Sequence, residues 1–282
     1  MRTLADEWRG SGYRVIGDRL RAGGLVINDK RVERIWREAG LTATKVKRSR
    51  NGPRRAPQLA NASAANERWA LDFLSDRLEN GHAYRMLAVI DVFTRECLAI
   101  DLARSMPASR VVKTLERIAA VRGLPLMFTT DNGPEFINAT LDRWAQTNGV
   151  QHSKSRPGTP TDNPFIESFN ARLRAECVDL WWTESILEGQ AAVNLWRRRY
   201  NDERPHGSLG RLTPTRFAET APWVYFRALT TSKSSQDLES QNQKQRQKQS
   251  QKQSQKKSQK NLAVHGPRAS SMTQHSSTMS VP

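Results

Sequence analysis

Three short apolar runs follow one another between residues 68 and 103, and their pattern is typical of β-strands. They read RWALDFLSD, YRMLAVIDVFT and CLAIDLA. The middle run is almost continuously apolar, as expected of a strand that is buried on both faces. Because the connections between the runs are short, we expect the three strands to form an antiparallel meander.

Helical periodicity alternates with strands over the next hundred residues. ASRVVKTLERIAAVRG, NATLDRWAQTNG and TDNPFIESFNARLRAEC are predicted helices, and the last begins with capping residues and a proline, Pro164, in its first turn. PLMFTT and VQHSKS are predicted strands, and residues 184–200 form one more predicted helix. The order β-β-β-α-β-α-β-α indicates an α/β fold with a mixed five-stranded sheet and flanking helices.

A separate helical pattern precedes these elements. In residues 13–40, apolar positions at helical spacing lie on both sides of Gly23-Gly24, which predicts two short helices around a turn. The basic residues of the second helix are Lys30, Arg31, Arg34 and Arg37. Residues 1–42 are therefore interpreted as a small helix-turn-helix-like region that contacts DNA. A solvated basic helical hairpin is the alternative.

Charge is concentrated at the two ends of the 282-residue chain. Residues 1–55 hold 15 basic and 6 acidic side chains, residues 56–222 hold 20 of each, and residues 223–282 hold 10 and 2. Basic ends of this kind suit a polyanion, with nucleic acid first. Residues 43–65 are predicted to be a basic linker, in which Lys45, Lys47, Arg48 and Arg50 are further DNA-contact candidates. The Gln/Lys/Ser-rich tail, residues 223–282, is expected to be disordered.

The cysteines and the apolar stretches indicate the cellular compartment in which we expect the protein. Cys97 and Cys177 match no disulfide or zinc spacing, and we expect buried, reduced thiols. No stretch is long and apolar enough for a membrane span, and the first residues lack the apolar core of a secretory signal. We therefore expect no membrane association and a cytoplasmic, nucleoid-associated protein.

Three carboxylates stand out by position. Asp72 lies in the first predicted strand, Asp131 ends the fourth, and Glu167 lies in the first turns of a capped helix, off its apolar stripe. If the first and fourth strands are neighbours, the three side chains converge. Clustered carboxylates repel one another unless cations neutralise them, and Mg²⁺ prefers such oxygen ligands. Two ions of this kind can activate a nucleophile and stabilise a leaving oxygen at phosphorus.

Other polar residues have simpler interpretations. The sequence Asp131-Asn132-Gly133-Pro134 is by itself sufficiently explained as a turn. Asp91 and Asp101 are interpreted as structural or edge carboxylates, Asp76 as a turn residue and Glu135 as a helix-start charge. For His206 a satisfied structural histidine is more common than a base.

Taken together, the motifs resemble a known family. The order Asp, Asp, Glu, with 35 residues between Asp131 and Glu167, is similar to the DDE core of retroviral integrases and transposases. The segments WALDF, TTDNGPEF, SRPGTPTDNPFIESFNARLRAEC and YNDERPHGSLGRLTPTRF resemble insertion-sequence-three family transposases. The resemblance implies an RNase H-like integrase catalytic core with C-terminal helices over residues 66–222. Within it, Asp72, Asp131 and Glu167 would be the catalytic metal ligands for Mg²⁺ or Mn²⁺, with two ions bound.

The resemblance also implies the activity and the partners. It implies metal-dependent DNA strand cleavage and strand transfer at element ends, by a DDE polynucleotidyl transferase that acts on element-end and target DNA. A homo-oligomer on DNA and a partner protein from an upstream reading frame are implied as well. Two alternatives stay open: a catalytically silent DNA-binding regulator or decayed transposase fragment, and an RNase H-like nuclease that acts on RNA.

Overall fold

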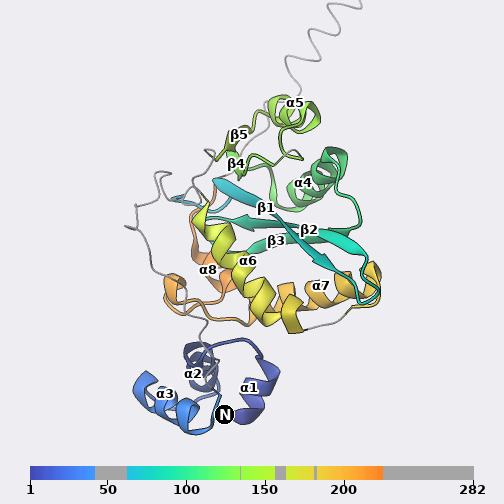
Figure 1. Ribbon diagram of the computed structural model, residues 1–282. Coiled ribbons are helices and arrows are strands. Elements are labelled where there is room, and N and C mark those ends of the chain that lie inside the picture. The colour runs from blue at the N-terminus through green and yellow to red at the C-terminus, as the bar shows by residue number, and fades with distance from the viewer. Residues whose placement is uncertain (42–61, 134, 156–162, 181–182, 225–282) are drawn as a thin grey trace, which may run out of the picture. The chain divides into compact units, whose positions relative to one another are not determined.

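The computed structural model describes residues 1–41, 62–133, 135–155, 163–180 and 183–224 (Figure 1). Lys45, Lys47, Arg48, Arg50 and nearly all of the expected tail lie outside the described residues. In chain order, the elements of the core are β1 Arg68–Arg77, β2 Ala83–Asp91, β3 Cys97–Ala103, α4 Ala108–Arg122, β4 Met127–Thr130, α5 Ala139–Asn148, β5 Gln151–Lys154, α6 Pro164–Glu176, η2 Val178–Leu180, α7 Ile186–Asp202, η3 Gly207–Leu209 and α8 Pro214–Thr220. No helix within the described ranges is long and apolar enough to cross a membrane.

The N-terminal region contains three helices rather than the two that periodicity predicts. They are α1 Arg2–Glu7, α2 Tyr13–Ala22 and α3 Asp29–Glu38. Ile16 and Trp36 pack into a small apolar cluster together with Ala5 and Trp8. The side chain of Asn28 accepts a hydrogen bond from the Arg31 backbone N–H at 2.8 Å and so caps α3.

The sheet has the strand order β3-β2-β1-β4-β5. β1 pairs antiparallel with β2, and β2 pairs antiparallel with β3, which confirms the predicted meander. β4 lies parallel to β1 on its other side, with Ala70 opposite Thr129. The first and fourth strands are therefore neighbours, as the convergence of the carboxylates requires.

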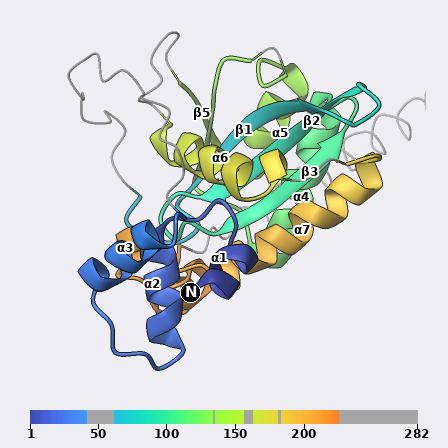
Figure 2. The same ribbon diagram turned by 60° about the horizontal axis from the view of Figure 1, so that its bottom comes forward.

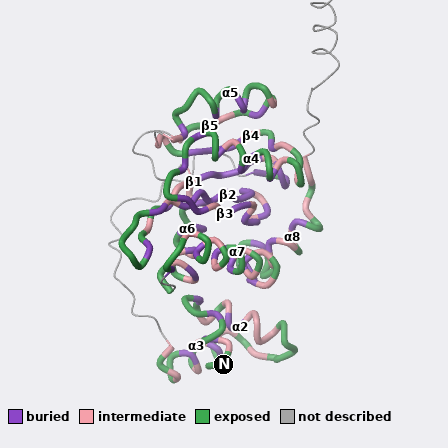
Figure 3. The backbone as a smooth tube through the Cα atoms, turned by 90° about the vertical axis from the view of Figure 1, so that its right-hand side faces the viewer, coloured by how far each residue is buried: buried purple, intermediate pink, exposed green. Residues whose placement is uncertain are grey.

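Each face of the sheet carries its own apolar cluster, because side chains alternate along β1. Ala70 and Leu74 pack toward α6 and α7, whereas Trp69, Leu71 and Phe73 face the α4 and α5 side. Figures 1 and 2 show the two helical layers, and Figure 3 shows that the strands between them are the most buried part. Asp72 is two residues from both Ala70 and Leu74 along β1, so its side chain lies on the same face of the sheet as theirs, the α6 face.

Helix α7 covers the free edge of the sheet by means of its polar side chains. Asn201 accepts a hydrogen bond from the Cys97 backbone N–H at 2.8 Å and donates to the Cys97 carbonyl at 2.9 Å. Gln190 accepts from the Leu102 N–H and donates to the Ile100 carbonyl, each at 2.8 Å. These amides satisfy edge groups of β3 that would otherwise offer a template for another strand.

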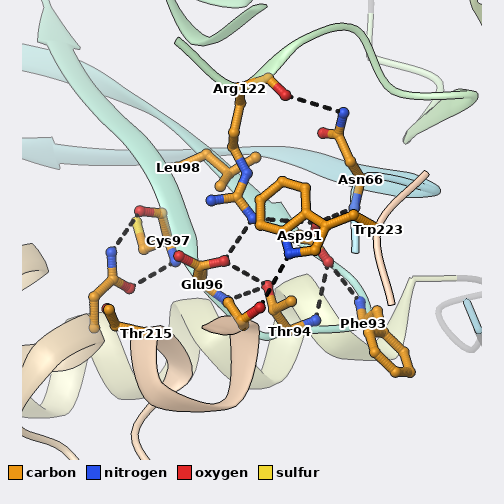
Figure 4. A network of polar contacts seen from close by, with 12 residues as sticks. Asn66, Asp91, Phe93, Thr94, Glu96, Cys97, Leu98, Arg122, Thr215 and Trp223 are labelled. Carbon is orange, nitrogen blue, oxygen red and sulfur yellow. Dashed lines mark hydrogen bonds and ion pairs between the residues drawn. The ribbon is translucent and has the colours of Figure 1, made fainter. Parts of the chain in front are cut away.

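The two ends of the core lie together. Ala65 forms an isolated parallel bridge with Trp223, and Ala65 and Ala62 are buried. The linker expected over 43–65 and the tail expected from 223 therefore each include residues that belong to the core. The guanidinium of Arg122 lies 4.6 Å from the centroid of the Trp223 ring, beside the polar network in Figure 4. Cys97 and Cys177 are buried and free, as expected.

Candidate active site

Asp72 lies near the middle of the central strand with both carboxylate oxygens hydrogen-bonded. Oδ1 accepts a hydrogen bond from the Phe73 backbone N–H at 2.8 Å, and Oδ2 accepts one from Asn170 Nδ2 of α6 at 2.7 Å. The side chain is half-buried between the strand and the helix. These two contacts fix the orientation of the carboxylate.

Asp131 is the first residue after β4. In the parallel pair of β1 and β4, Ala70 lies opposite Thr129, so Asp72 and Asp131 each lie two residues beyond this register. Asp131 is exposed, and its Oδ1 accepts a hydrogen bond from the Gly133 N–H at 2.9 Å. Gly133 does not adopt a left-handed conformation. Its lack of a side chain matters because a Cβ there would lie 3.0 Å from Asp131 Oδ1.

Glu167 lies in the first turn of α6, on the flank of the helix that faces β1. On the same flank, Asn170 reaches Asp72, and Arg174 donates to Asp76 Oδ2 at 3.2 Å. Glu167 is one turn N-terminal to Asn170, and it is exposed. Partial burial raises the pKa of its carboxyl group. Helix α6 thus brings Glu167 to the strand that carries Asp72.

The charges of the three carboxylates interact at Asp72. The pKa of Asp72 is raised to about 6, mainly by burial and also by the negative charges of Asp131 and Glu167, against the two hydrogen bonds that stabilise the carboxylate. Nevertheless, the described residues contain no group of three His, Cys, Asp or Glu side chains that could already hold a metal ion. The three residues approach one another without forming a closed ligand set.

The four basic residues expected on the second helix lie in α3. Lys30, Arg31, Arg34 and Arg37 are all exposed, and we call them the α3 basic row. Arg34 lies 3.8 Å from Glu38, and Arg37 lies 3.4 Å from Glu33. Exposed pairs of this kind are weak, so these arginines are free to exchange their carboxylate partners for phosphates.

Two carboxylates have roles that differ from those predicted. Asp76 is not a turn residue, because it lies within β1 and pairs with Arg174 at 3.2 Å. Glu135 does not start a helix: α5 begins at Ala139, and Glu135 pairs with Arg85.

The structural interpretation of the other two strand carboxylates is confirmed. Asp91 is fully buried, and its Oδ1 accepts hydrogen bonds from the backbone N–H groups of Phe93 and Thr94 at 2.9 Å. Asp101, on β3, forms an ion pair with Arg117 of α4 at 2.8 Å.

Comparison with known proteins gives consistent matches. Two family models, both described as Integrase core domain, match residues 62–160 and 148–214. Over 216 residues the chain is 40% identical to the 31.7 kDa protein of insertion element IS407 from Burkholderia multivorans, covering 76% of this chain and 78% of that protein. Over 214 residues it is 28% identical to the transposase InsF for insertion sequence IS3A from Escherichia coli, covering 71% and 74%.

A solved structure shares the fold. A chain of the simian T-cell lymphotropic virus intasome in complex with the PP2A regulatory subunit B56 gamma matches with a TM-score of 0.53 at 17% identity, covering 73% of each chain. At this identity the likeness concerns the fold alone. It confirms the expected RNase H-like, integrase-type architecture with its mixed five-stranded sheet.

Proposed function

Because the chain belongs to the insertion-sequence-three family of transposases, with an integrase core, we propose that it cleaves DNA at the ends of its element and transfers the strands to target DNA. The observation that carries this proposal is the position of Asp72 in β1 beside Asp131 at the end of the neighbouring β4, where the charges of Asp131 and Glu167 both act on Asp72. Acidic side chains that raise one another's pKa are typical of sites that bind cations or act on phosphate groups.

Asp72, Asp131 and Glu167 are proposed to hold Mg²⁺ or Mn²⁺, as two ions. The donor set fits these cations, because it offers carboxylate oxygens and because a bound cation removes the repulsion that raises the pKa of Asp72. When bound, the ions would supply Lewis-acid stabilisation of charge at the phosphorus and its oxygens. Asn170 and the Phe73 N–H orient Asp72. No covalent protein–DNA intermediate is required, so we assign no Ser or Tyr nucleophile.

The α3 basic row and the basic residues at 45, 47, 48 and 50 are proposed to bind DNA mainly through phosphates. The segment 56–222 carries no net charge and includes the acidic site, so long-range attraction to DNA has to come from elsewhere in the chain. We further propose that the protein acts as a homo-oligomer on DNA in the cytoplasm, associated with the nucleoid. A partner from an upstream reading frame is part of the same proposal.

The test is a cleavage assay on purified full-length chain. Labelled element-end DNA is incubated with Mg²⁺, with Mn²⁺ or with EDTA, and the Asp131→Asn variant is run in parallel. We expect nicking and strand transfer that depend on the metal and are lost in Asp131→Asn, while both proteins still bind the DNA. Metal-independent nicking, or nicking by the variant, would contradict the assigned role of Asp131.

A catalytically silent DNA-binding regulator is the second candidate. It is favoured by one observation, the absence of a three-carboxylate group ready for a metal among the described residues. The same assay separates the two candidates, because a regulator binds the DNA as wild type and as Asp131→Asn but nicks it in neither form.

A further inference from the structure

Two arginines without carboxylate partners lie on the flank of α6 that faces away from Asp72. Arg172 is on α6 itself, and Arg95 comes from the turn between β2 and β3. Phe165 and Arg172, seven residues apart, share this flank, whereas Glu167, Asn170 and Arg174 occupy the opposite one. Neither arginine forms an ion pair with any residue in the described part of the chain.

The turn that carries Arg95 is held rigidly by the network in Figure 4. Asp91 Oδ1 accepts hydrogen bonds from the Phe93 and Thr94 backbone N–H groups, and Thr94 Oγ1 donates to Glu96 at 2.9 Å. Within this turn Arg95 has a φ of +64°, which non-glycine residues adopt infrequently. A strained residue that its surroundings hold in place is a reason to look for a function of its side chain.

The Arg95 side chain is positioned on α6. Its guanidinium lies 3.7 Å from the centroid of the Phe165 ring, so it stacks on the second residue of the helix. Its Nη1 is buried and has no hydrogen-bond partner in the described structure, so the guanidinium has at least one unused donor. Burial lowers the pKa of Arg95, the charges of Tyr200 and Asp91 oppose this effect, and the charge of Arg172 adds to it, so the two cations are close enough to interact.

Among the described residues no carboxylate forms an ion pair with either arginine, although the charge of the buried Asp91 raises the pKa of Arg95. Next to them lies His206, which is 4% exposed and whose Nε2 has no partner among the described residues. Burial and the charges of Arg204, Arg172 and Arg95 lower the pKa of His206 to about 3, so its ring is neutral at physiological pH. The nearby Glu176 carboxylate is engaged by Arg204 through three hydrogen bonds of 2.6–3.1 Å.

We infer that Arg95 and Arg172 form a phosphate-binding subsite that takes a phosphodiester of the DNA strand lying along α6. This inference rests on the proposed action on DNA. Guanidinium groups bind phosphate strongly, and neither of these two forms an ion pair within the described residues. Arg172 Nη1 donates to the Ser168 carbonyl at 2.9 Å, which draws its guanidinium toward the half of α6 where Arg95 stacks on Phe165. The subsite lies on the flank of α6 opposite to Glu167, so it would hold the DNA backbone across the helix from the acidic site.

The experiment measures DNA affinity against salt with full-length chains in EDTA, so that cleavage does not enter. The variant is Arg95→Gln/Arg172→Gln. The matched control, Lys113→Gln/Arg143→Gln, removes two exposed charges from α4 and α5, which cover the other face of the sheet. Each lost phosphate contact should flatten the slope of log affinity against log salt by about 0.9. Loss of the one proposed phosphate contact should therefore flatten the slope of the test variant by about 0.9, and its deficit relative to wild type should shrink about 3.5-fold between 50 and 200 mM salt.

A second variant distinguishes the loss of the two charges from misfolding. Arg95→Lys/Arg172→Lys keeps both charges and should retain most of the slope. An unchanged slope in the glutamine variant, or an equal loss in the Lys113/Arg143 control, overturns the subsite while DNA binding itself stands. A wild-type chain that binds no DNA at low salt overturns both the subsite and the proposed function.

Discussion

Replacing Asp72 with Asn is expected to stabilise the fold while abolishing metal-dependent cleavage. Asp72 is half-buried, and its pKa is raised to about 6 by burial and by Asp131 and Glu167. At neutral pH the folded chain must therefore hold a carboxylate that its surroundings disfavour. Asn keeps the size and the acceptor for the Phe73 N–H. Asn170 has an Oδ1 that is buried without a partner in the described structure. Rotation of its side-chain amide by about 180° would let this oxygen accept a hydrogen bond from the amide introduced at position 72.

The expected magnitude follows from the difference between the folded and unfolded pKa values of Asp72. An unfolded value of 3.8 and a folded value of about 6 correspond to about 3 kcal/mol, at about 1.4 kcal/mol for each pH unit. The folded state binds the proton more tightly, so the cost is absent below pH 3.8, grows as the pH rises toward 6 and is complete above that. Asp72→Asn should thus be about 2–3 kcal/mol more stable than wild type at pH 7.5, about half of that at pH 5, and nearly equal to it at pH 3.5.

Urea denaturation in EDTA, followed by tryptophan fluorescence at these three pH values, measures the difference. Asp76→Asn is the matched control on the same strand, because it only removes an ion pair with Arg174 and should not stabilise the chain. Saturating Mg²⁺, about 100 times its dissociation constant, should stabilise wild type by about 2.7 kcal/mol and the variant by much less. A stability gain that does not change with pH, or no gain at pH 7.5, would refute the electrostatic account of Asp72.

Three further outcomes are expected. Changing the whole α3 basic row to Gln should flatten the salt slope of DNA binding by up to about 3.6, and an unaltered slope in fluorescence anisotropy would rule out α3 as the DNA contact. Asn201→Ala should cost about 1–3 kcal/mol in urea denaturation, since it leaves the Cys97 N–H without its acceptor and leaves the Cys97 carbonyl only its longer hydrogen bond from Arg197; a cost as small as that of Arg198→Ala, at an exposed position of α7, would show that the edge contact is unimportant. Arg204→Met should cost about 3–5 kcal/mol because Glu176 is left buried and unpaired, and adding Glu176→Gln should restore part of it; no recovery would mean that Arg204 acts through packing alone.

The meander of the first three strands could be predicted from local patterns. The continuous apolar run of β2 marks a strand covered on both faces, and the short connections on either side of it leave the meander as the simple arrangement. The placement of β4 beside β1 entered the sequence analysis only as a condition, because the side on which a strand joins the sheet after a helix has no local signal, and the structure shows the pair to be parallel. Asp72 and Asp131 became neighbours through this topology.

The contacts that orient the site could not be predicted, because they join residues far apart in sequence. Asn170 could be placed on the same helix flank as Glu167, but its hydrogen bond to Asp72 depends on how α6 crosses β1. Asp76 resembled a turn residue because the length of β1, which extends to Arg77, has no local signal. Helix α1 was missed because six residues give too few turns for periodicity to register.

The bridge between Ala65 and Trp223 brings the first and last residues of the integrase core together. Its chain enters and leaves at adjacent points, so segments fused before residue 62 or after residue 224 start from one place and leave the sheet undisturbed. Cores with this property can be moved between proteins as single blocks, and they tolerate circular permutation when a short linker joins the two ends. If the flanking segments recognise DNA as we propose, their exchange is expected to change the DNA target while the proposed site stays as it is.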